Sequence, residues 1–184
     1  MQPDEHVREL LAHVIPNVDW SSEHLRDTPE RFVGMLRELT DRSRLVFQFK
    51  TFENVNHIDE MVVLQDIPFK SLCAHHLLPF VGTTDVAYLP DWKLAGLSKL
   101  ARAVQFWSAG LWVQEDLTER IANFIQEKLE PKGVAVVMRA EHFCMSLRGA
   151  SVVGTKTTTS KMTGAFLDPT KGARQEFLQL IRSK

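Results

Sequence analysis

The stretch FENVNHIDEMVVLQDIPFKSLCAHHLLPFVGTTDVAYLP, residues 52–90, decides the fold of this chain. It lacks the helical spacing of apolar residues that precedes it, and β-branched residues are frequent in it. Its last part begins at Gly82 and ends at Pro90. We therefore expect two antiparallel strands that flank one cysteine and two adjacent histidines, Cys73, His75 and His76.

Apolar residues at helical spacing mark the segments on both sides of this stretch. Before it we expect two amphipathic helices, and Asp27, Thr28 and Pro29 begin the second as a cap followed by proline. After it we expect two more, the second of which stops at Pro131 and Gly133. The expected helices span residues 4–15, 27–39, 96–112 and 113–133.

The end of the chain is expected to form a strand pair, residues 133–149 and 155–167, and a last helix, residues 173–183. This order predicts an α+β fold in which helices pack on one face of an antiparallel sheet. The sheet domain is expected to cover residues 51–184, preceded by an N-terminal helical arm of residues 1–50.

Composition excludes several classes of protein. The chain has 184 residues, 44% hydrophobic and 24% charged, which is typical of one soluble globular domain. Its 22 Lys and Arg against 23 Asp and Glu give no broad positive field for nucleic acid, so an anionic ligand needs a local cluster of cations. Apolar stretches end well before the roughly 18 residues of a membrane helix. Two cysteines and no signal segment favour a cytoplasmic protein with free thiols.

Both cysteines have histidine within three residues, a coincidence that composition alone makes about 0.05 probable. In a strand over residues 133–149 side chains alternate between faces. The expected strand therefore sorts polar and apolar side chains onto opposite sides. One side would carry His142, Cys144, Ser146 and Arg148, and the other Phe143, Met145 and Leu147.

Cys73, His76 and Cys144 together supply two thiolates and one imidazole, a donor set suited to zinc. No second Cys-x-x-Cys supplies a fourth ligand, and three protein ligands with a free position are the catalytic pattern. His75 and His142 are then available for proton transfer at neutral pH. Taken singly, each cysteine is also explained as a small buried apolar residue, and each histidine as a surface or hydrogen-bonded ring.

Six motifs, in this order, closely resemble the GTP cyclohydrolase I family over residues 25–182: SLCAHHLLPFVG, VAYLP, GLSKLARAVQFW, VQEDLTERIA, GVAVVMRAEHFCMSLRG and TKTTTSKMTGAF. The resemblance implies the tunnelling fold, in which subunits form a closed ring. It also implies a decamer of two stacked pentameric rings with sites between subunits. The implied reaction converts GTP and water to 7,8-dihydroneopterin triphosphate and formate, with Zn²⁺ as cofactor. Water attacks C8 of guanine, the ribose rearranges and the pterin ring closes.

The resemblance also assigns roles by position. Cys73, His76 and Cys144 match the zinc ligands. His75 matches the histidine that protonates the purine imidazole nitrogen, and His142 a second histidine of the site. The remaining matches concern the rest of the substrate: Ser98 for the ribose, Gln114 and Glu115 for guanine, and Lys99, Arg102, Arg148 and Arg31 for the triphosphate.

Simpler explanations exist for several of these residues. Lys99 and Arg102 share a helix face, so they can converge on one anion or merely form a solvated basic face. Ser98 can be a helix cap, and Gln114 and Glu115 ordinary first-turn residues. Arg31 can pair with Glu30 or Glu38. The strand propensity of threonine explains residues 157–159, so we assign them no chemistry.

The chain departs from the family pattern in two places. Ala74 stands where many members have glutamate, and residues 150–154 are neutral where another charge is frequent. Two other functions fit parts of the sequence. One is a related tunnelling-fold enzyme acting on a pterin or deazaguanine, including nitrile reductases, and the other is a zinc-stabilised assembly protein without activity. Folate, tetrahydrobiopterin and deazaguanine pathways all begin with the implied reaction, so the sequence does not select one.

Overall fold

The computed structural model describes residues 2–182. Within them the chain divides into two compact units, one ending at Asp41 and one starting at Arg42. The outer ends of the expected arm and domain, and the end of the expected last helix, lie outside the described residues. The division after residue 50 remains a prediction. Among residues 2–182 no helix is long and apolar enough to cross a membrane.

The first unit consists of α1 (Pro3–Val14) and α2 (Thr28–Thr40), close to the two helices expected from the sequence. The backbone N–H of Gln2 donates to the Glu5 carboxylate at 2.7 Å, which satisfies one free donor at the start of α1. Arg8 of α1 donates to the backbone oxygens of Trp20 and Arg26, at 3.3 and 2.5 Å. These bonds fasten the connecting segment to α1.

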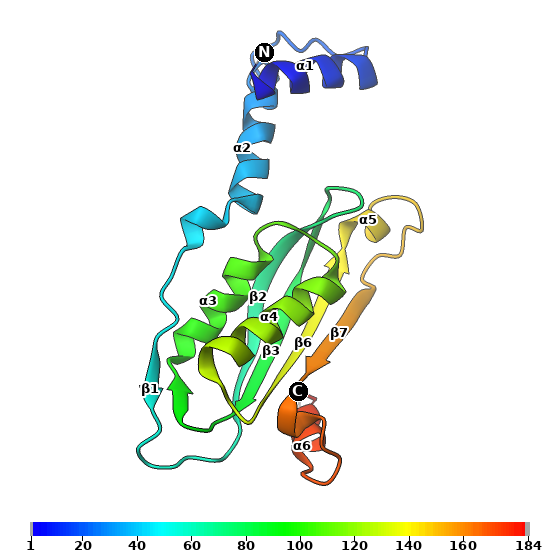
Figure 1. The fold of residues 1–184 in the computed structure, drawn as a ribbon. Helices are drawn as coiled ribbons and strands as arrows, with labels where there is room; N and C mark the ends of the chain where they lie inside the picture. Colours follow the sequence, from blue (N-terminus) through cyan, green and yellow to red (C-terminus); the bar gives the residue numbers. More distant parts are fainter. Residues whose placement is uncertain (1, 183–184) are drawn as a thin grey trace. The chain divides into compact units, whose positions relative to one another are not determined.

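A five-stranded sheet forms the centre of the second unit, in the order β5-β2-β3-β6-β7 (Figure 1). Its strands are β2 (Val62–Cys73), β3 (Pro79–Leu89), β5 (Leu111–Trp112), β6 (Gly133–His142) and β7 (Lys156–Met162). The pairs β2–β3, β3–β6 and β6–β7 are antiparallel, as the sequence predicts. The prediction of a purely antiparallel sheet was wrong at one edge, because the short β5 pairs parallel to β2. The sheet is therefore mixed.

Two helices cover one face of this sheet, α3 (Leu97–Ser108) and α4 (Gln114–Leu129) (Figure 1). Their apolar residues pack against alternate residues of the central strands, including Val86, Val134 and Val136. Because side chains of a strand alternate between faces, the intervening residues point to the other side. The main core of the unit lies between these helices and the sheet.

The opposite face is covered at one end by the 3-10 helix η2 (Gly164–Phe166) and by α6 (Ala173–Leu180). Phe166 and Phe177 pack there against Ala135 and Val137, the alternate residues of β6. The expectation that helices cover only one face was therefore wrong. The apolar alternate residues of β6 need cover on both faces, since each side would otherwise expose them to water.

Several short elements were not expected from the sequence. Helix α3 ends at Ser108 rather than near residue 112, because Gly110 has φ +142° and the chain then enters β5. The expected strand over residues 133–149 stops at His142 and continues as a short helix, α5 (Phe143–Ser146). Strands β1 (Thr51–Glu53) and β4 (Lys93–Ala95) form a separate pair, and the 3-10 helix η1 (Arg42–Leu45) opens the unit.

Gly82 lies where the backbones of β3 and β6 leave no room for a side chain. A Cβ atom added at this position would come within 1.8 Å of the Arg139 backbone oxygen, which no side chain rearrangement relieves. Gly82 pairs with Ala140. This pair lies two positions along the sheet from the pair formed by Phe80 and His142. The glycine thus permits the strand pairing that leads to the candidate site.

We predict that Gly82→Ala destabilises the protein by about 3 kcal/mol or more, because the added methyl group forces the two strands apart. The change is measured by urea unfolding followed by circular dichroism. Gly34→Ala in α2 is the matched control: its Cβ meets nothing within 4 Å, and Ala in a helix interior is expected to stabilise slightly. Equal stability of Gly82→Ala and the natural protein would contradict the described strand approach.

Candidate metal centre

The end of β2 and the turn that follows it carry two candidate metal ligands, one buried and one exposed. Cys73 ends β2 and is buried, whereas His75 and His76 lie in the turn and are exposed. The Cys73 backbone N–H donates to the Leu78 oxygen at 2.9 Å, and its oxygen accepts from the His76 and Leu77 N–H groups. Leu77 has φ +56°, an uncommon conformation for this residue type that closes the turn. The turn thus fixes the start of the site through backbone bonds.

Strand β5 supports this turn from the side. The Ala74 N–H donates to the Trp112 backbone oxygen at 3.0 Å, and Cys73 pairs with Trp112 in the sheet. Arg42 in turn lies over the Trp107 and Trp112 rings, 5.0 and 4.9 Å from their centroids, and donates to the Ala109 oxygen at 2.7 Å. A cation between two aromatic faces is a favourable contact that holds β5 in place.

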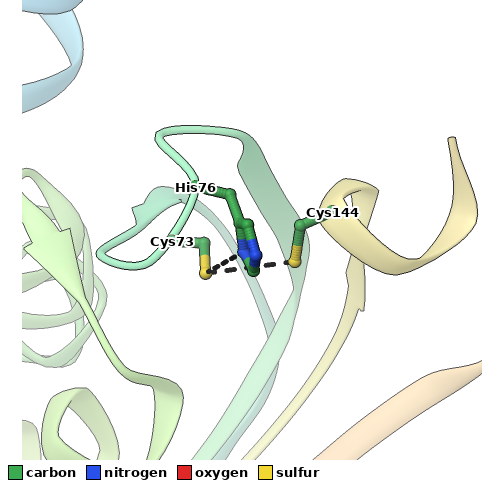
Figure 2. A group of neighbouring side chains, drawn as sticks. All are labelled: Cys73, His76 and Cys144. Atoms are coloured by element: carbon green, nitrogen blue, oxygen red, sulfur yellow. Dashed lines mark hydrogen bonds between the residues drawn. The ribbon is translucent and has the colours of Figure 1, made fainter. Parts of the chain in front are cut away.

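Cys73, His76 and Cys144 converge at the end of the sheet, with all three donor atoms within 4.8 Å of one another (Figure 2). The Cys73 sulfur lies 3.9 Å from the Cys144 sulfur and 3.8 Å from His76 Nδ1. Ligands around a tetrahedral zinc, with Zn–S of about 2.3 Å and Zn–N of about 2.0 Å, lie about 3.5 to 3.8 Å apart. The three donors therefore fit one metal ion with little movement, and this group can bind a metal.

Cys144 reaches this group from α5, not from a strand. The sequence prediction that His142, Cys144, Ser146 and Arg148 alternate on one strand face was wrong, because the chain turns into a helix after His142. Burial and the neighbouring Cys73 raise the pKa of the Cys144 thiol, and the positive charge of Arg148 partly opposes this. Two thiols this close resist losing both protons until a cation compensates the two negative charges.

His75 also lies beside the group without joining it. Its Nδ1 is 3.8 Å from the Cys73 sulfur, but the metal-capable set contains His76 and not His75. The two rings lie 6.0 Å apart and are tilted by 75°. His75 therefore lies outside the metal-capable set, as an exposed imidazole at the edge of the candidate metal centre, where an acid-base group could act.

His142 ends β6 and is held on two sides. Its ring stacks on Phe80 with 4.7 Å between centroids and 2° between planes. Its Nε2 lies 2.7 Å from the Gln114 side-chain oxygen. Burial lowers the pKa of His142 below its ordinary range, and the Glu115 carboxylate opposes this shift. The ring is therefore predominantly neutral at neutral pH.

The sequence did not indicate three residues that shape this part of the site. Phe80 reads as a core aromatic, while Thr118 and Thr159 read as helix and strand residues. In the structure Thr159 accepts a hydrogen bond from the Gln114 amide at 3.1 Å and lies 2.6 Å from Thr118 Oγ1. Thr157 and Thr159 are half-buried while Thr158 is exposed, an alternation that would have indicated their common face.

Helix α3 carries Ser98, Lys99 and Arg102 away from the metal-capable group. The end of α3 lies beside Cys73, because the Leu72 N–H donates to the Gly110 oxygen at 3.3 Å. Ser98 stands at the other end, roughly 15 Å away for ten residues at about 1.5 Å each. Figure 1 shows this end of α3 next to β4 and far from α5. The cap of α3 is Gly96, so Ser98 is not the cap residue.

The remaining expected residues are placed as follows. Glu115 is exposed in the first turn of α4 and acts electrostatically on His142. Arg148 follows α5 and is exposed near Cys144. Gln114 is 2% exposed, and protein groups occupy both ends of its amide. Arg31 lies in the first unit, where it pairs with Asp27 at 3.3 Å.

Comparison with known proteins gives one consistent answer. A family model described as GTP cyclohydrolase I matches residues 4–182. The chain belongs to the GTP cyclohydrolase I family. It is 49% identical over 164 residues to GTP cyclohydrolase 1 of Aquifex aeolicus, covering 89% of this chain and 88% of the relative. It is 44% identical over 180 residues to GTP cyclohydrolase 1 of Coxiella burnetii, covering 97% and 96%. The resemblance found in the sequence is thereby confirmed, and the chain is a GTP cyclohydrolase I enzyme.

A solved structure of the archaeosine synthase QueF-Like in the apo form is also similar. It is 15% identical, covers 56% of this GTP cyclohydrolase I chain and 93% of its own, and has a TM-score of 0.45. That similarity is too weak to support an argument about fold or function. The α+β class of this family member rests on its own sheet and helices.

We predict that replacing any of the three converging donors weakens binding of a divalent metal, with zinc as the probe. Cys73→Ser, Cys144→Ser and His76→Ala are each expected to lower affinity by at least about a hundredfold, since even hydrogen-bonded partners of ligands contribute about 10–100-fold. Binding is measured by competition with a chelator of known affinity.

His75→Ala is the matched control, because its ring is equally close to Cys73 and equally exposed. It is expected to keep the affinity of the natural protein. Undiminished zinc in Cys144→Ser, or equal losses in His75→Ala and His76→Ala, would contradict the three-donor assignment.

Proposed function

We propose that this enzyme is a zinc-dependent GTP cyclohydrolase I that converts GTP and water to 7,8-dihydroneopterin triphosphate and formate. The observation that carries the proposal is the convergence of two thiols and one imidazole at distances suited to one ion, beside two further histidines. Family membership supplies the substrate class. The reaction would begin a route to tetrahydrofolate or to related pterins or deazapurines.

Cys73, His76 and Cys144 are proposed to hold the zinc ion. Zinc in such a site supplies Lewis acidity and lowers the pKa of water to about 7. Two thiolates offset the charge of the cation, and the turn and α5 that carry them are held by the backbone of the sheet end. The residues of the chain then have to orient the purine and move protons around C8.

His75 is proposed to protonate the purine imidazole nitrogen as the ring opens. Its exposed imidazole lies beside the metal-capable group, and histidine is the side chain most often used as a general acid or base. His142 is proposed as the second acid-base group. Its neutral ring is held against Phe80, so it accepts a proton without first having to reorient.

The rest of GTP is proposed to meet polar residues on several elements. Glu115 accepts hydrogen bonds from the N–H groups of guanine, and Ser98 contacts the ribose. Lys99, Arg102, Arg148 and Arg31 surround the triphosphate, whose negative charges need such a cluster because the protein has a net charge of only −1. That Gln114 contacts guanine remains a prediction from the resemblance.

The length of α3 supports the proposal of a site shared between subunits. Ser98 and Lys99 stand near the start of α3, at the opposite end of that helix from Cys73, and Arg102 lies in its middle, which favours their supply from another copy. We therefore propose a homo-oligomer in which a second copy supplies these residues. The tunnelling fold, with two stacked pentameric rings forming a decamer, provides that arrangement.

We predict that the purified protein with zinc turns over GTP. Formate and a product that becomes fluorescent after oxidation are expected, measured on a sample of known metal content. His75→Ala is expected to lower kcat by about a hundredfold or more, the usual contribution of a positioned proton donor, while retaining zinc. No product from GTP at full zinc occupancy would reject the proposed function.

Mixing of inactive variants tests the shared site. If His75 and Lys99 of one site come from different chains, co-expressed His75→Ala and Lys99→Ala are expected to recover about a quarter of the natural activity in random mixed rings. His75→Ala mixed with Cys144→Ser is the control, because both residues lie at the same sheet end. It is expected to recover none. Sedimentation of the natural protein as a stable monomer, or no recovery in the first mixture, would contradict the shared site.

A further inference from the structure

The side-chain amide of Gln114 is buried in a network that spans three elements. Gln114 begins α4 and is 2% exposed, and Thr118, one turn later, is 1% exposed. The Gln114 amide nitrogen donates toward the Met138 oxygen of β6 at 3.3 Å, the Thr157 oxygen of β7 at 3.1 Å and Thr159 Oγ1 at 3.1 Å. The amide thus joins the start of α4 to two strands.

The direction of each hydrogen bond in this network follows from the groups present. Thr118 Oγ1 lies 2.7 Å from the Gln114 backbone oxygen, which only accepts, so Thr118 donates its one hydroxyl hydrogen there. Thr118 then accepts at its 2.6 Å contact with Thr159, so Thr159 is the donor. Thr159 Oγ1 still has a lone pair for the Gln114 amide nitrogen. The Thr118 hydroxyl therefore donates to the Gln114 backbone oxygen, and the Thr159 hydroxyl donates to Thr118. Reversing the second bond would require Thr118 to donate two hydrogens, and it has only one.

The orientation of the Gln114 amide is fixed in the same way. The backbone oxygens of Met138 and Thr157 accept only, so the NH₂ end must face them. A flipped amide would place its oxygen against two carbonyl oxygens in a buried site. The amide oxygen therefore faces His142 Nε2, 2.7 Å away. Because this oxygen accepts only, the His142 nitrogen must carry the hydrogen.

We infer that Gln114, Thr118 and Thr159 are positioning residues that orient the His142 ring and hold a hydrogen on its Nε2. The Phe80 ring, stacked at 4.7 Å, fixes the plane of the imidazole. Nδ1 is then the nitrogen with the free lone pair, so His142 presents a hydrogen-bond acceptor and proton acceptor at Nδ1 only. This inference rests on the proposed function for its kinetic consequence, but not for the tautomer itself.

The inference assigns the Gln114 side chain to His142 rather than to the guanine base. A residue that contacts guanine in the ground state changes KM when it is truncated, whereas a residue that positions an acid-base group changes kcat. Gln114→Leu removes the acceptor of His142 Nε2 and keeps the approximate volume of the side chain. It is expected to lower kcat on the order of a hundredfold while KM changes by less than about threefold.

Substitutions at Thr159 of β7 test the positioning role more directly. Thr159 contacts Gln114 and Thr118 but is assigned no contact with His142. Thr159→Val keeps the shape of threonine but removes its hydroxyl, so both Gln114 and Thr118 lose a partner. It is expected to lower kcat on the order of tenfold with unchanged KM. Thr159→Ser keeps the hydroxyl and is expected to restore kcat to near the natural value. Thr158→Val, the exposed neighbour, is the matched control and is expected to have no effect.

A second measurement does not depend on activity. Nitrogen-15 NMR of protein with labelled histidine rings separates protonated from unprotonated ring nitrogens, and the His142 signals are identified by their loss in His142→Gln. Neutral His142 is expected to carry its proton on Nε2 in the natural protein and to become a mixture of tautomers in Gln114→Leu, which removes the acceptor of Nε2. This readout distinguishes positioning from a purely structural role, which would leave the tautomer unchanged.

The kinetic and NMR measurements distinguish failure of this inference from failure of the proposed function. A natural protein that does not turn over GTP rejects the function, and the NMR experiment then still decides the tautomer. Protonation of neutral His142 on Nδ1 in the natural protein would overturn the inference. So would a Thr159→Val enzyme with the kinetics of Thr158→Val, or a Gln114→Leu enzyme in which KM rises while kcat is retained. If Thr159→Val does not fold, the tautomer of the natural protein and the kinetics of Thr159→Ser and Gln114→Leu decide.

Discussion

The pairing of β3 with β6 is the constraint on which the candidate site depends. Phe80 lies directly opposite His142 in this pairing, which places the end of β6 beside the start of β3. Cys73 and Cys144 are separated by 71 positions in the sequence, yet their sulfurs lie 3.9 Å apart. A slip of one residue would turn every side chain of β6 to the other face and separate His142 from Phe80. The close approach at Gly82 belongs to the same constraint.

Two kinds of contact hold the candidate site in place: backbone hydrogen bonds fix the turn after Cys73, and side chains fix His142. The turn after Cys73 is defined by backbone bonds to Leu78 and Trp112, so the two adjacent histidines stay exposed while the thiol is buried. His142 is instead held by a stacked ring and by a buried amide. Buried polar networks of this kind are stable only when every member is satisfied, which makes their geometry well defined. The imidazoles of His75 and His76 are therefore exposed, whereas the half-buried ring of His142 is oriented by its neighbours.

Much of this arrangement could be predicted from the sequence, and the short elements that the prediction missed have a common cause. The central strands, the long helices and the proximity of Cys73, His76 and Cys144 were expected and are present. The short α5, the parallel edge strand β5 and the cover of the second sheet face by α6 were not. Two- and four-residue elements contain too few residues for a periodic pattern to identify them. Helix α5 nevertheless decides how Cys144 reaches the other donors.

The sequence by itself determined the chemistry available to this protein. Two cysteines near histidines, and six motifs in family order, establish the family and the candidate metal ligands before any coordinates are considered. Only the tertiary structure decided that Gln114 faces His142, that Thr159 bonds both Gln114 and Thr118, and that Ser98 lies far from Cys73 within one chain. The physical reason is that side-chain type sets which bonds a residue can make, whereas strand register and helix length set which partners it can reach.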